Sequence, residues 1–340
     1  MPEDAITGLE LAEVAASSQP LAVRAEALLE TLLRFVPFDG AWLALADPHV
    51  PSYTTGASAD LADSTLTFLA GPKHARDIEL AGGNRAVPPM SPSDLPFPAE
   101  ETPTWAECLI PAGYHEGLGV ALFLPQGRQV GFLALMSGSR EPPSPQVRRS
   151  LRWLLPTLAY GIDPLRSLAA AARLVHRATA GVVLHEDGAT EVLPGLASHA
   201  LLAAVSPAVV AARQALRAGQ SYTAFLWPQG GRDAPQGHAR LTVLASTDDV
   251  PAFLLGMVLV SAPGDLRGLT PRELEVLGLL IEGSSNAAIS RALVIAPRTV
   301  AAHLEHIMAK LSAQSRTLAA VRAEREGLYV PRQLGAPPQA

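Results

Sequence analysis

The side chains with the clearest capacity for chemistry lie on one predicted helix near the C-terminus, which opens at Pro297 and whose apolar stripe reaches Leu311. Each helical residue advances about 100°, so Val300, Leu304 and Ile307 share a narrow sector that would face a core. The opposite sector is small or polar, which suits a surface that enters the major groove of DNA. The residues predicted to contact DNA are Arg298, Thr299, Ala301, Ala302, Glu305, His306 and Lys310.

These side chains divide by what they can contact. The cations and the hydroxyl can donate to phosphate oxygens, the contacts that supply most of the affinity for DNA. The methyl groups of Ala301 and Ala302 match the thymine C5-methyl, and the Glu305 carboxylate can accept a hydrogen bond from cytosine N4. The alternative for Glu305 is a solvated carboxylate that only weakens phosphate binding.

The elements before this helix would hold it in place. Thr270 is predicted to cap a first helix that runs through Ile281. A Gly283–Ser284–Ser285 break follows, and a short helix then runs through Leu293. A tight turn leads to Pro297 at the first position of the next helix. Two helices joined in this way are the sequence form of a helix-turn-helix.

The same segment carries a more specific pattern of residues. It consists of Leu269–Thr270–Pro271–Arg272–Glu273, Glu275–Val276–Leu277, Glu282–Gly283, Ser285–Asn286, Ile289, Pro297–Arg298–Thr299–Val300, His303–Leu304, Lys310–Leu311 and Ser315–Arg316–Thr317. This pattern resembles the LuxR-type (GerE-like) helix-turn-helix of bacterial transcription regulators, over less than a fifth of the chain. The resemblance implies an all-α domain of four helices that binds double-stranded promoter DNA as a homodimer, and it allows RNA polymerase as a further partner. Its fourth helix, within 316–325, would pair two copies through Leu318, Ala319 and Val321.

The segment departs from the usual pattern of this family at several positions. Ala287, Ala301 and Ala302 stand where the family often has Lys or another polar residue. Glu305 stands where a basic residue is common. Residues 266–332 hold nine Arg and Lys against six Glu, a net charge of +3. This modest charge predicts weak DNA binding by a monomer and reliance on a dimer.

Length and composition bound the rest of the molecule. A chain of 340 residues has room for two or three domains. No apolar run approaches the roughly 18–20 residues that span a bilayer, and no signal peptide is evident, so we expect a cytoplasmic protein without a membrane partner. The single cysteine, Cys108, excludes an intrachain disulfide and a multi-thiolate metal site. A buried structural thiol is favoured for it over a reactive one.

The region before the DNA-binding segment has a different charge and pattern. Residues 1–265 carry 17 basic and 26 acidic side chains, a net charge of −9, so only the C-terminal part suits nucleic acid. Residues 1–162 resemble a GAF domain in their order of predicted elements. These are a helix over 10–35, a strand over 41–46, a Pro- and Gly-rich segment over 70–104 typical of a lid or a mobile segment, a hairpin of strands 119–124 and 130–136, and a helix over 144–160.

A second α+β region is predicted over residues 179–262, after a connecting helix over 163–178. It begins with a hairpin of strands 181–186 and 190–193 and continues with two short helices within 196–219. Strands over 221–227, 240–245 and 253–260 complete it, and this layout resembles a PAS domain. Residues 263–268 would be a linker to the helix-turn-helix domain at 269–332, and residues 333–340 a disordered tail.

No catalytic or metal-ligating set stands out in the sequence. The chain has only two lysines, lacks a phosphate-binding G-x-x-x-x-G-K-[ST] loop, and has scattered histidines, so we expect no enzyme, no metal and no cofactor. Five aromatic residues of the first domain could line a cavity for an unknown small-molecule effector, although core packing is the alternative for each. They are Trp42, Tyr53, Trp105, Tyr114 and Phe123.

The sequence thus predicts α+β sensory domains (GAF-like, then PAS-like) followed by an all-α four-helix DNA-binding domain. The predicted function is sequence-specific transcriptional regulation, with the N-terminal region sensing a small molecule or a partner. The alternative is an N-terminal half that is a protein-interaction or dimerisation module without a ligand pocket. An enzyme with an attached DNA-binding domain is a third, disfavoured possibility.

Overall fold

The computed structural model describes the chain except for residues 1, 176, 231–233, 235, 247–250 and 333–340. The tail predicted over 333–340 therefore lies outside the described residues. The chain forms two compact units, Met1–Ser167 with Asp248–Pro251, and Leu168–Thr247 with Ala252–Ala340.

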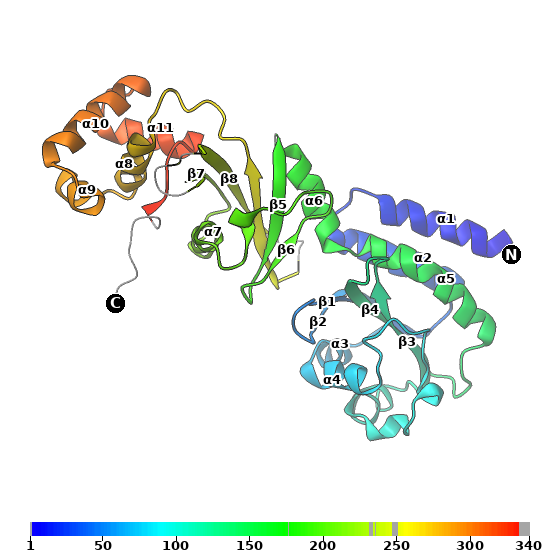
Figure 1. Ribbon diagram of the computed structural model, residues 1–340. Helices are drawn as coiled ribbons and strands as arrows, with labels where there is room; N and C mark the ends of the chain where they lie inside the picture. The colour runs from blue at the N-terminus through cyan, green and yellow to red at the C-terminus, as the bar shows by residue number, and fades with distance from the viewer. Residues whose placement is uncertain (1, 176, 231–233, 235, 247–250, 333–340) are drawn as a thin grey trace. The chain divides into compact units, whose positions relative to one another are not determined.

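The first unit is built on a four-stranded antiparallel sheet of order β2-β1-β4-β3, with helices on both faces (Figure 1). Alternate residues of β1 face opposite sides, so Leu43 joins a core with α1, α2 and α5, whereas Trp42 joins a core with α3, α4 and η3. The elements are α1 Pro2–Ala16, α2 Leu21–Phe35, β1 Gly40–Ala46, β2 Tyr53–Ala59, α3 Asp63–Leu69, α4 Pro72–Leu80, η1 Pro92–Asp94, η2 Ala99–Glu101, η3 Thr104–Leu109, β3 Glu116–Phe123, β4 Gln129–Ser137 and α5 Pro145–Gly161.

Two expectations for this unit need correction. The helix predicted over 10–35 is two helices, because the chain is extended at Pro20, the residue before α2. The buried Arg24 secures the start of α2 by donating to the Gly161 carbonyl at 2.5 Å and to the Gln19 carbonyl at 2.7 Å. The segment 70–104 is more structured than a lid would be, since it contains α4 and two short 3-10 turns.

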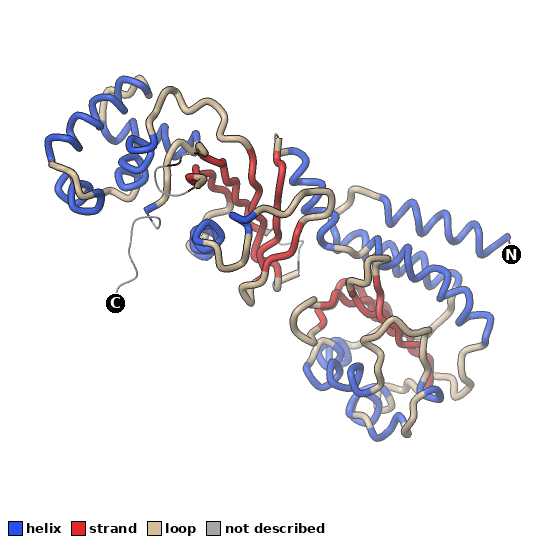
Figure 2. The backbone as a smooth tube through the Cα atoms, in the orientation of Figure 1, coloured by secondary structure: helices blue, strands red, loops and turns tan. Residues whose placement is uncertain are grey.

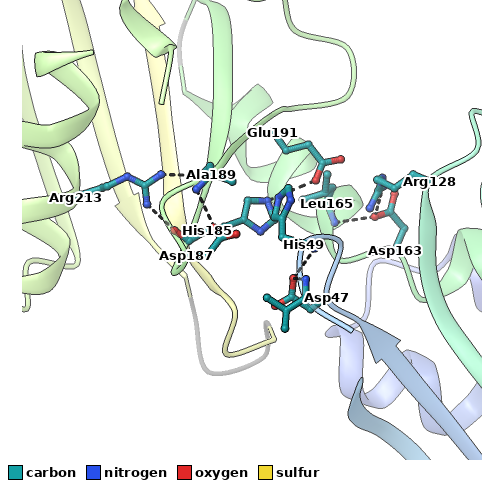
Figure 3. Close-up of polar contacts among 11 residues, drawn as sticks. Asp47, His49, Arg128, Asp163, Leu165, His185, Asp187, Ala189, Glu191 and Arg213 are labelled. Carbon is teal, nitrogen blue, oxygen red and sulfur yellow. Dashed lines mark hydrogen bonds and ion pairs between the residues drawn. The ribbon is translucent and has the colours of Figure 1, made fainter. Parts of the chain in front are cut away.

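The second unit contains a five-stranded antiparallel sheet of order β6-β5-β9-β8-β7, with α7 packed on one face. Arg213 of α7 fixes the β5–β6 turn by donating to the carbonyls of His185, Gly188 and Ala189 at 2.5–2.6 Å (Figure 3). The helix before the sheet ends four residues earlier than predicted. The elements are α6 Pro164–Leu174, β5 Ala178–His185, β6 Thr190–Val192, η4 Ala200–Leu202, α7 Pro207–Arg217, β7 Tyr222–Pro228, β8 His238–Ala245 and β9 Leu254–Ser261.

Helices α8–α11 follow in the same unit and share one apolar core (Figure 2). The described residues of this part contain no strand. Val300, Leu304 and Ile307 are buried in the core, which confirms the predicted stripe. The helices are α8 Pro271–Ile281, α9 Asn286–Leu293, α10 Pro297–Lys310 and α11 Arg316–Glu326.

The chain after α11 joins this helical domain to the outer strand β7 of the sheet. The Leu226 amide of β7 donates to the Tyr329 carbonyl at 2.8 Å, and one residue further the Val330 amide donates to the Leu274 carbonyl of α8 at 3.1 Å. Arg240 of β8 donates to the Glu326 carbonyl at 2.7 Å. The segment 326–330 is therefore hydrogen-bonded to both the sheet and the helical domain.

Candidate nucleic-acid interface and ligand cavity

Helix α10 presents an open face to solvent. Arg298, Ala301, Ala302, Glu305 and His306 are exposed. Thr299 is half-buried at the start of the helix. Pro297 supplies the preset backbone of the first turn, since no side chain of the described residues caps this helix. The structure thus brings six of the seven predicted DNA-contacting residues to one end or one open face of a single helix.

The turn between α9 and α10 fixes how that face is held. Val294 ends α9 in the left-handed conformation with φ 55°, and its side chain is 86% exposed. The Ser290 hydroxyl donates to the Ile295 carbonyl at 2.5 Å, and this hydrogen bond stabilises the turn. Ser285 caps the start of α9 by accepting from the Ala288 amide. These contacts stabilise the start of α9 and the turn that leads to α10.

Lys310 forms an ion pair within the domain. Its ammonium group lies 2.7 Å from the Glu273 carboxylate, which also accepts from the amide and hydroxyl of Thr270 in a capping box. Burial would raise the pKa of Glu273, but the hydrogen bonds from Lys310 and Thr270 hold it below its usual range. The Glu273 side chain is almost fully buried, so Lys310 neutralises a carboxylate inside the domain. The Lys310 side chain is still 30% exposed, and its predicted phosphate contact stays a prediction.

Few cations in this domain remain free for phosphate. Arg272 and Arg322 donate to backbone carbonyls of the domain itself, and Arg316 donates to the Ser284 carbonyl at 2.8 Å. Arg298 makes no hydrogen bond or ion pair with the described residues. Arg291, on the exposed side of α9, bonds only within its own helix at 3.4 Å and was not among the predicted residues. A basic residue in the last turn of the predicted short helix was the available signal.

The predicted pairing surface on α11 is smaller than expected. Ala319 is fully buried in the core of the domain and offers no surface to a partner. Leu318 is half-buried against that core, whereas Val321 is exposed. A pairing surface on this helix would therefore consist of Val321 and the edge of Leu318.

The first unit contains a cavity of about 110 Å³ between the sheet and the segments around α4 and η3. Of the five aromatic residues predicted to line a cavity, only Trp105 does so. The others are placed by packing and hydrogen bonds. Trp42 donates from its indole to Thr55, Tyr53 accepts from Gln129, Tyr114 donates to the Asp60 carbonyl, and Phe123 packs at the edge of the same core.

A buried polar chain that sequence reasoning missed borders this cavity. His74 of α4 lies 3.0 Å from the Thr104 hydroxyl, which donates to the Asp77 carboxylate at 2.6 Å. All three residues line the cavity. His74 is 6% exposed, and desolvation lowers its pKa to about 4. His74 and Thr104 are 30 positions apart in the chain, so no local pattern could have paired them.

Other candidate chemistry in the described residues is sparse. Cys108 is a buried free thiol, and burial raises its pKa, which disfavours the reactive thiolate. Within the part of the chain that the structure describes, no group of three or more His, Cys, Asp or Glu side chains could hold a metal ion. None of the described helices combines the length and apolarity needed to cross a membrane.

Comparison with known proteins identifies the C-terminal helices. Residues 267–323 match the model of the GerE family, described as bacterial regulatory proteins, luxR family. The chain is 47% identical to the transcriptional regulatory protein LiaR of Bacillus subtilis over 60 residues, which are 18% of this chain and 28% of that protein. It is 38% identical to the nitrate/nitrite response regulator protein NarL of Escherichia coli over 65 residues, 19% of this chain and 30% of that protein. The C-terminal domain is thus a LuxR-type helix-turn-helix domain, as predicted.

The chain matches less than a third of the length of either relative. Among solved structures, it resembles the phycoerythrobilin-bound GAF domain of a cyanobacterial phytochrome, with a TM-score of 0.38 and 12% identity over 49% of this chain and 97% of that one. GAF domains are therefore among the structural neighbours of the N-terminal region.

Proposed function

We propose that the protein is a sequence-specific DNA-binding transcriptional regulator whose N-terminal region senses a small molecule. The exposed face of α10, held in a LuxR-type domain, is the observation that carries the DNA-binding part. Arg298 and Thr299 would contact phosphates, while Ala301, Ala302 and Glu305 would meet base edges.

Binding as a homodimer follows from the sparse charge of this domain. With Lys310 paired and several arginines holding backbone carbonyls, one copy has few cations for phosphates. Two copies double that number, and a two-fold axis places their recognition helices about one helical turn apart on DNA. Val321 and the edge of Leu318 would lie in the pairing surface.

The sensory part rests on the layout of the two α+β regions. We assign residues 1–162 to a GAF-like domain, 163–178 to a connector, 179–262 to a PAS-like domain, 263–268 to a linker and 269–332 to the DNA-binding domain. The hairpin, helical middle and three returning strands of the second sheet support the PAS-like assignment. The cavity beside His74 supports sensing within the first domain.

An interaction module without a ligand is the second candidate. On α5, Trp153 is 60% exposed and Tyr160 is 49% exposed. Large aromatic side chains exposed on one helix are typical of a surface that binds another protein.

Selection of duplexes from a randomised pool by the full-length chain tests DNA recognition. We expect an enriched palindrome, and sedimentation at saturating protein should give two chains per duplex. Strictly one chain per duplex would exclude the dimer, and the absence of any enriched sequence would contradict the proposal. Two results together would favour the interaction module. The doubly substituted W153S/Y160S chain would lose self-association, and metabolites would leave the melting temperature of the unsubstituted chain unchanged.

A further inference from the structure

The strongest unassigned feature of the molecule is one nitrogen of a buried histidine. His74 is nine-tenths buried and lines the cavity of the first unit. Its Nδ1 is hydrogen-bonded to the Thr104 hydroxyl, but its Nε2 has no hydrogen-bond partner among the described residues. A buried polar atom without a partner costs about 1–3 kcal/mol, so native proteins rarely leave one unused.

The neighbouring hydrogen bonds determine where the histidine proton lies. Both the amide and the hydroxyl of Thr104 donate to the same Asp77 oxygen, at 2.7 Å and 2.6 Å. Because the hydroxyl proton points to Asp77, the Thr104 oxygen must accept from Nδ1 of His74. The ring is neutral in this buried place, since desolvation lowers its pKa to about 4. Nε2 is therefore an acceptor without a proton.

The rest of the cavity wall limits what could donate to this atom. Most lining side chains are apolar, among them Ile78, Met90, Leu109, Phe132 and Met136. No Lys or Arg of the described chain lines the cavity, and Asp77, the acidic residue among the lining side chains, disfavours an anion. Its Oδ2 is already engaged by Thr104, so it offers only partial support to a cation.

We propose that this cavity binds an uncharged, largely apolar ring compound with a single hydroxyl or N–H group, which donates to Nε2 of His74. The inference deepens the proposed sensing function by naming the class of effector and the atom that selects it. The apolar wall supplies most of the affinity, and Nε2 discriminates compounds that carry a donor from those that lack one.

Phenol and anisole form a pair of probes for the full-length protein, since anisole carries a methyl group in place of the hydroxyl proton and so lacks the donor. We expect phenol to bind at least about tenfold more tightly than anisole by calorimetry, because anisole leaves the buried nitrogen unpaired. In the variant His74→Phe, which keeps a ring of similar size, the two probes should bind alike. Equal binding of both probes to the wild-type chain would overturn the proposal, as would no saturable binding of phenol.

Two further measurements guard against a variant that does not fold. In the wild-type chain labelled with 15N-histidine, phenol should shift the Nε2 resonance of His74 upfield, and anisole should leave it in place. An unchanged resonance under saturating phenol would contradict the assigned contact. Benzylamine is the cationic probe, and tighter binding of benzylamine than of phenol would show that the site selects a charged amine instead.

DNA binding separates this inference from the function on which it rests. The same preparation should retard the selected duplex whether or not phenol is preferred. If the protein binds DNA but does not prefer phenol, the proposed ligand class is wrong. If it binds no duplex, the proposed function as a regulator is wrong.

Discussion

At the scale of single residues, the charges of the DNA-binding domain fall into two classes. Lys310 and Glu273 form a partly buried pair that serves the domain itself. Arg298 and Glu305 are exposed on or beside the open face of α10 and are available to DNA. We therefore expect substitution of the paired residues to change the stability of the domain, and substitution of the exposed residues to change DNA binding.

Lys310→Met should destabilise the DNA-binding domain by about 1–3 kcal/mol, because it leaves the Glu273 carboxylate buried and unpaired. The double variant K310M/E273Q should recover part of that loss. Since the folded-state pKa of Glu273 is lowered, the stability it contributes is present above the unfolded pKa near 4.3 and is lost as the pH falls through the folded pKa. Amide exchange in α8 measures both effects. Wild-type stability in K310M, with a reduced salt dependence of DNA binding, would restore the phosphate role.

Arg298→Ala should weaken binding to all duplexes about equally and lower the salt slope of the affinity by about one. The guanidinium is exposed and has no partner among the described residues of the domain, so folding should be unaffected. Arg152→Ala, an exposed helical arginine of the first unit, is the matched control and should leave the slope unchanged. A change in preferred sequence at constant slope would assign Arg298 to a base instead.

Glu305→Gln tests direct readout by the exposed carboxylate on α10. If Glu305 accepts from a cytosine, the variant should lose on the order of 1–3 kcal/mol only on sites that carry that base pair. Binding assays on the selected duplex and on single-base variants of it measure this loss. A uniform gain in affinity for every duplex would instead show that the carboxylate only repels phosphate.

At the scale of elements, the turn before α10 carries strain. Val294 is β-branched and adopts φ 55°, a conformation that costs a side chain of this kind roughly 1–2 kcal/mol. Its side chain is exposed and gives little packing in return. The geometry of the helix-turn-helix therefore overrides the preference of this residue.

Val294→Asn should stabilise the DNA-binding domain by about 1 kcal/mol, because Asn tolerates the left-handed conformation. Val205→Asn is the control, since Val205 is similarly exposed but is not among the described residues with positive φ. Denaturant unfolding followed by amide exchange in α9 and α10 gives the comparison. Equal effects of the two substitutions would refute the strain argument.

At the scale of the whole molecule, the segment after α11 couples the DNA-binding domain to the second sheet. Gly327 adopts φ 63°, and a Cβ there would lie 2.9 Å from the Ala224 carbonyl of β7. Tyr329 places its ring 6.4 Å from Phe225 and its hydroxyl 3.3 Å from Thr223. Only a glycine allows the chain to leave α11 this close to the strand.

Gly327→Ala should loosen the helical domain from β7 and speed amide exchange at Leu226, whose N–H donates to Tyr329. Gly268→Ala is the matched control. Gly268 has φ 69°, but a Cβ added there would meet no atom of the described residues within 4 Å, so this variant shares the backbone penalty without the clash. Equal exchange rates in the two variants would show that the contact contributes nothing beyond backbone strain.

Much of the local structure and the exposed face of α10 followed from sequence alone, because their causes are short-range. The apolar period of Val300, Leu304 and Ile307 fixed which side of α10 is buried, and Thr270 marked the start of α8. The β3–β4 and β5–β6 hairpins were placed from alternating apolar residues around turn residues, whereas strand β2 was not predicted. A break as small as that before α2 was missed because the apolar pattern continues on either side of Pro20.

Tertiary structure alone decided the long-range partners of polar groups, because those contacts join positions far apart in the chain. Lys310 meets Glu273 across 37 positions, and Thr104 meets Asp77 across 27. Packing likewise buried Ala319, which the family resemblance had placed in a pairing surface. Helical and strand periods report which side of an element is apolar, but they contain no information about which other element will cover it.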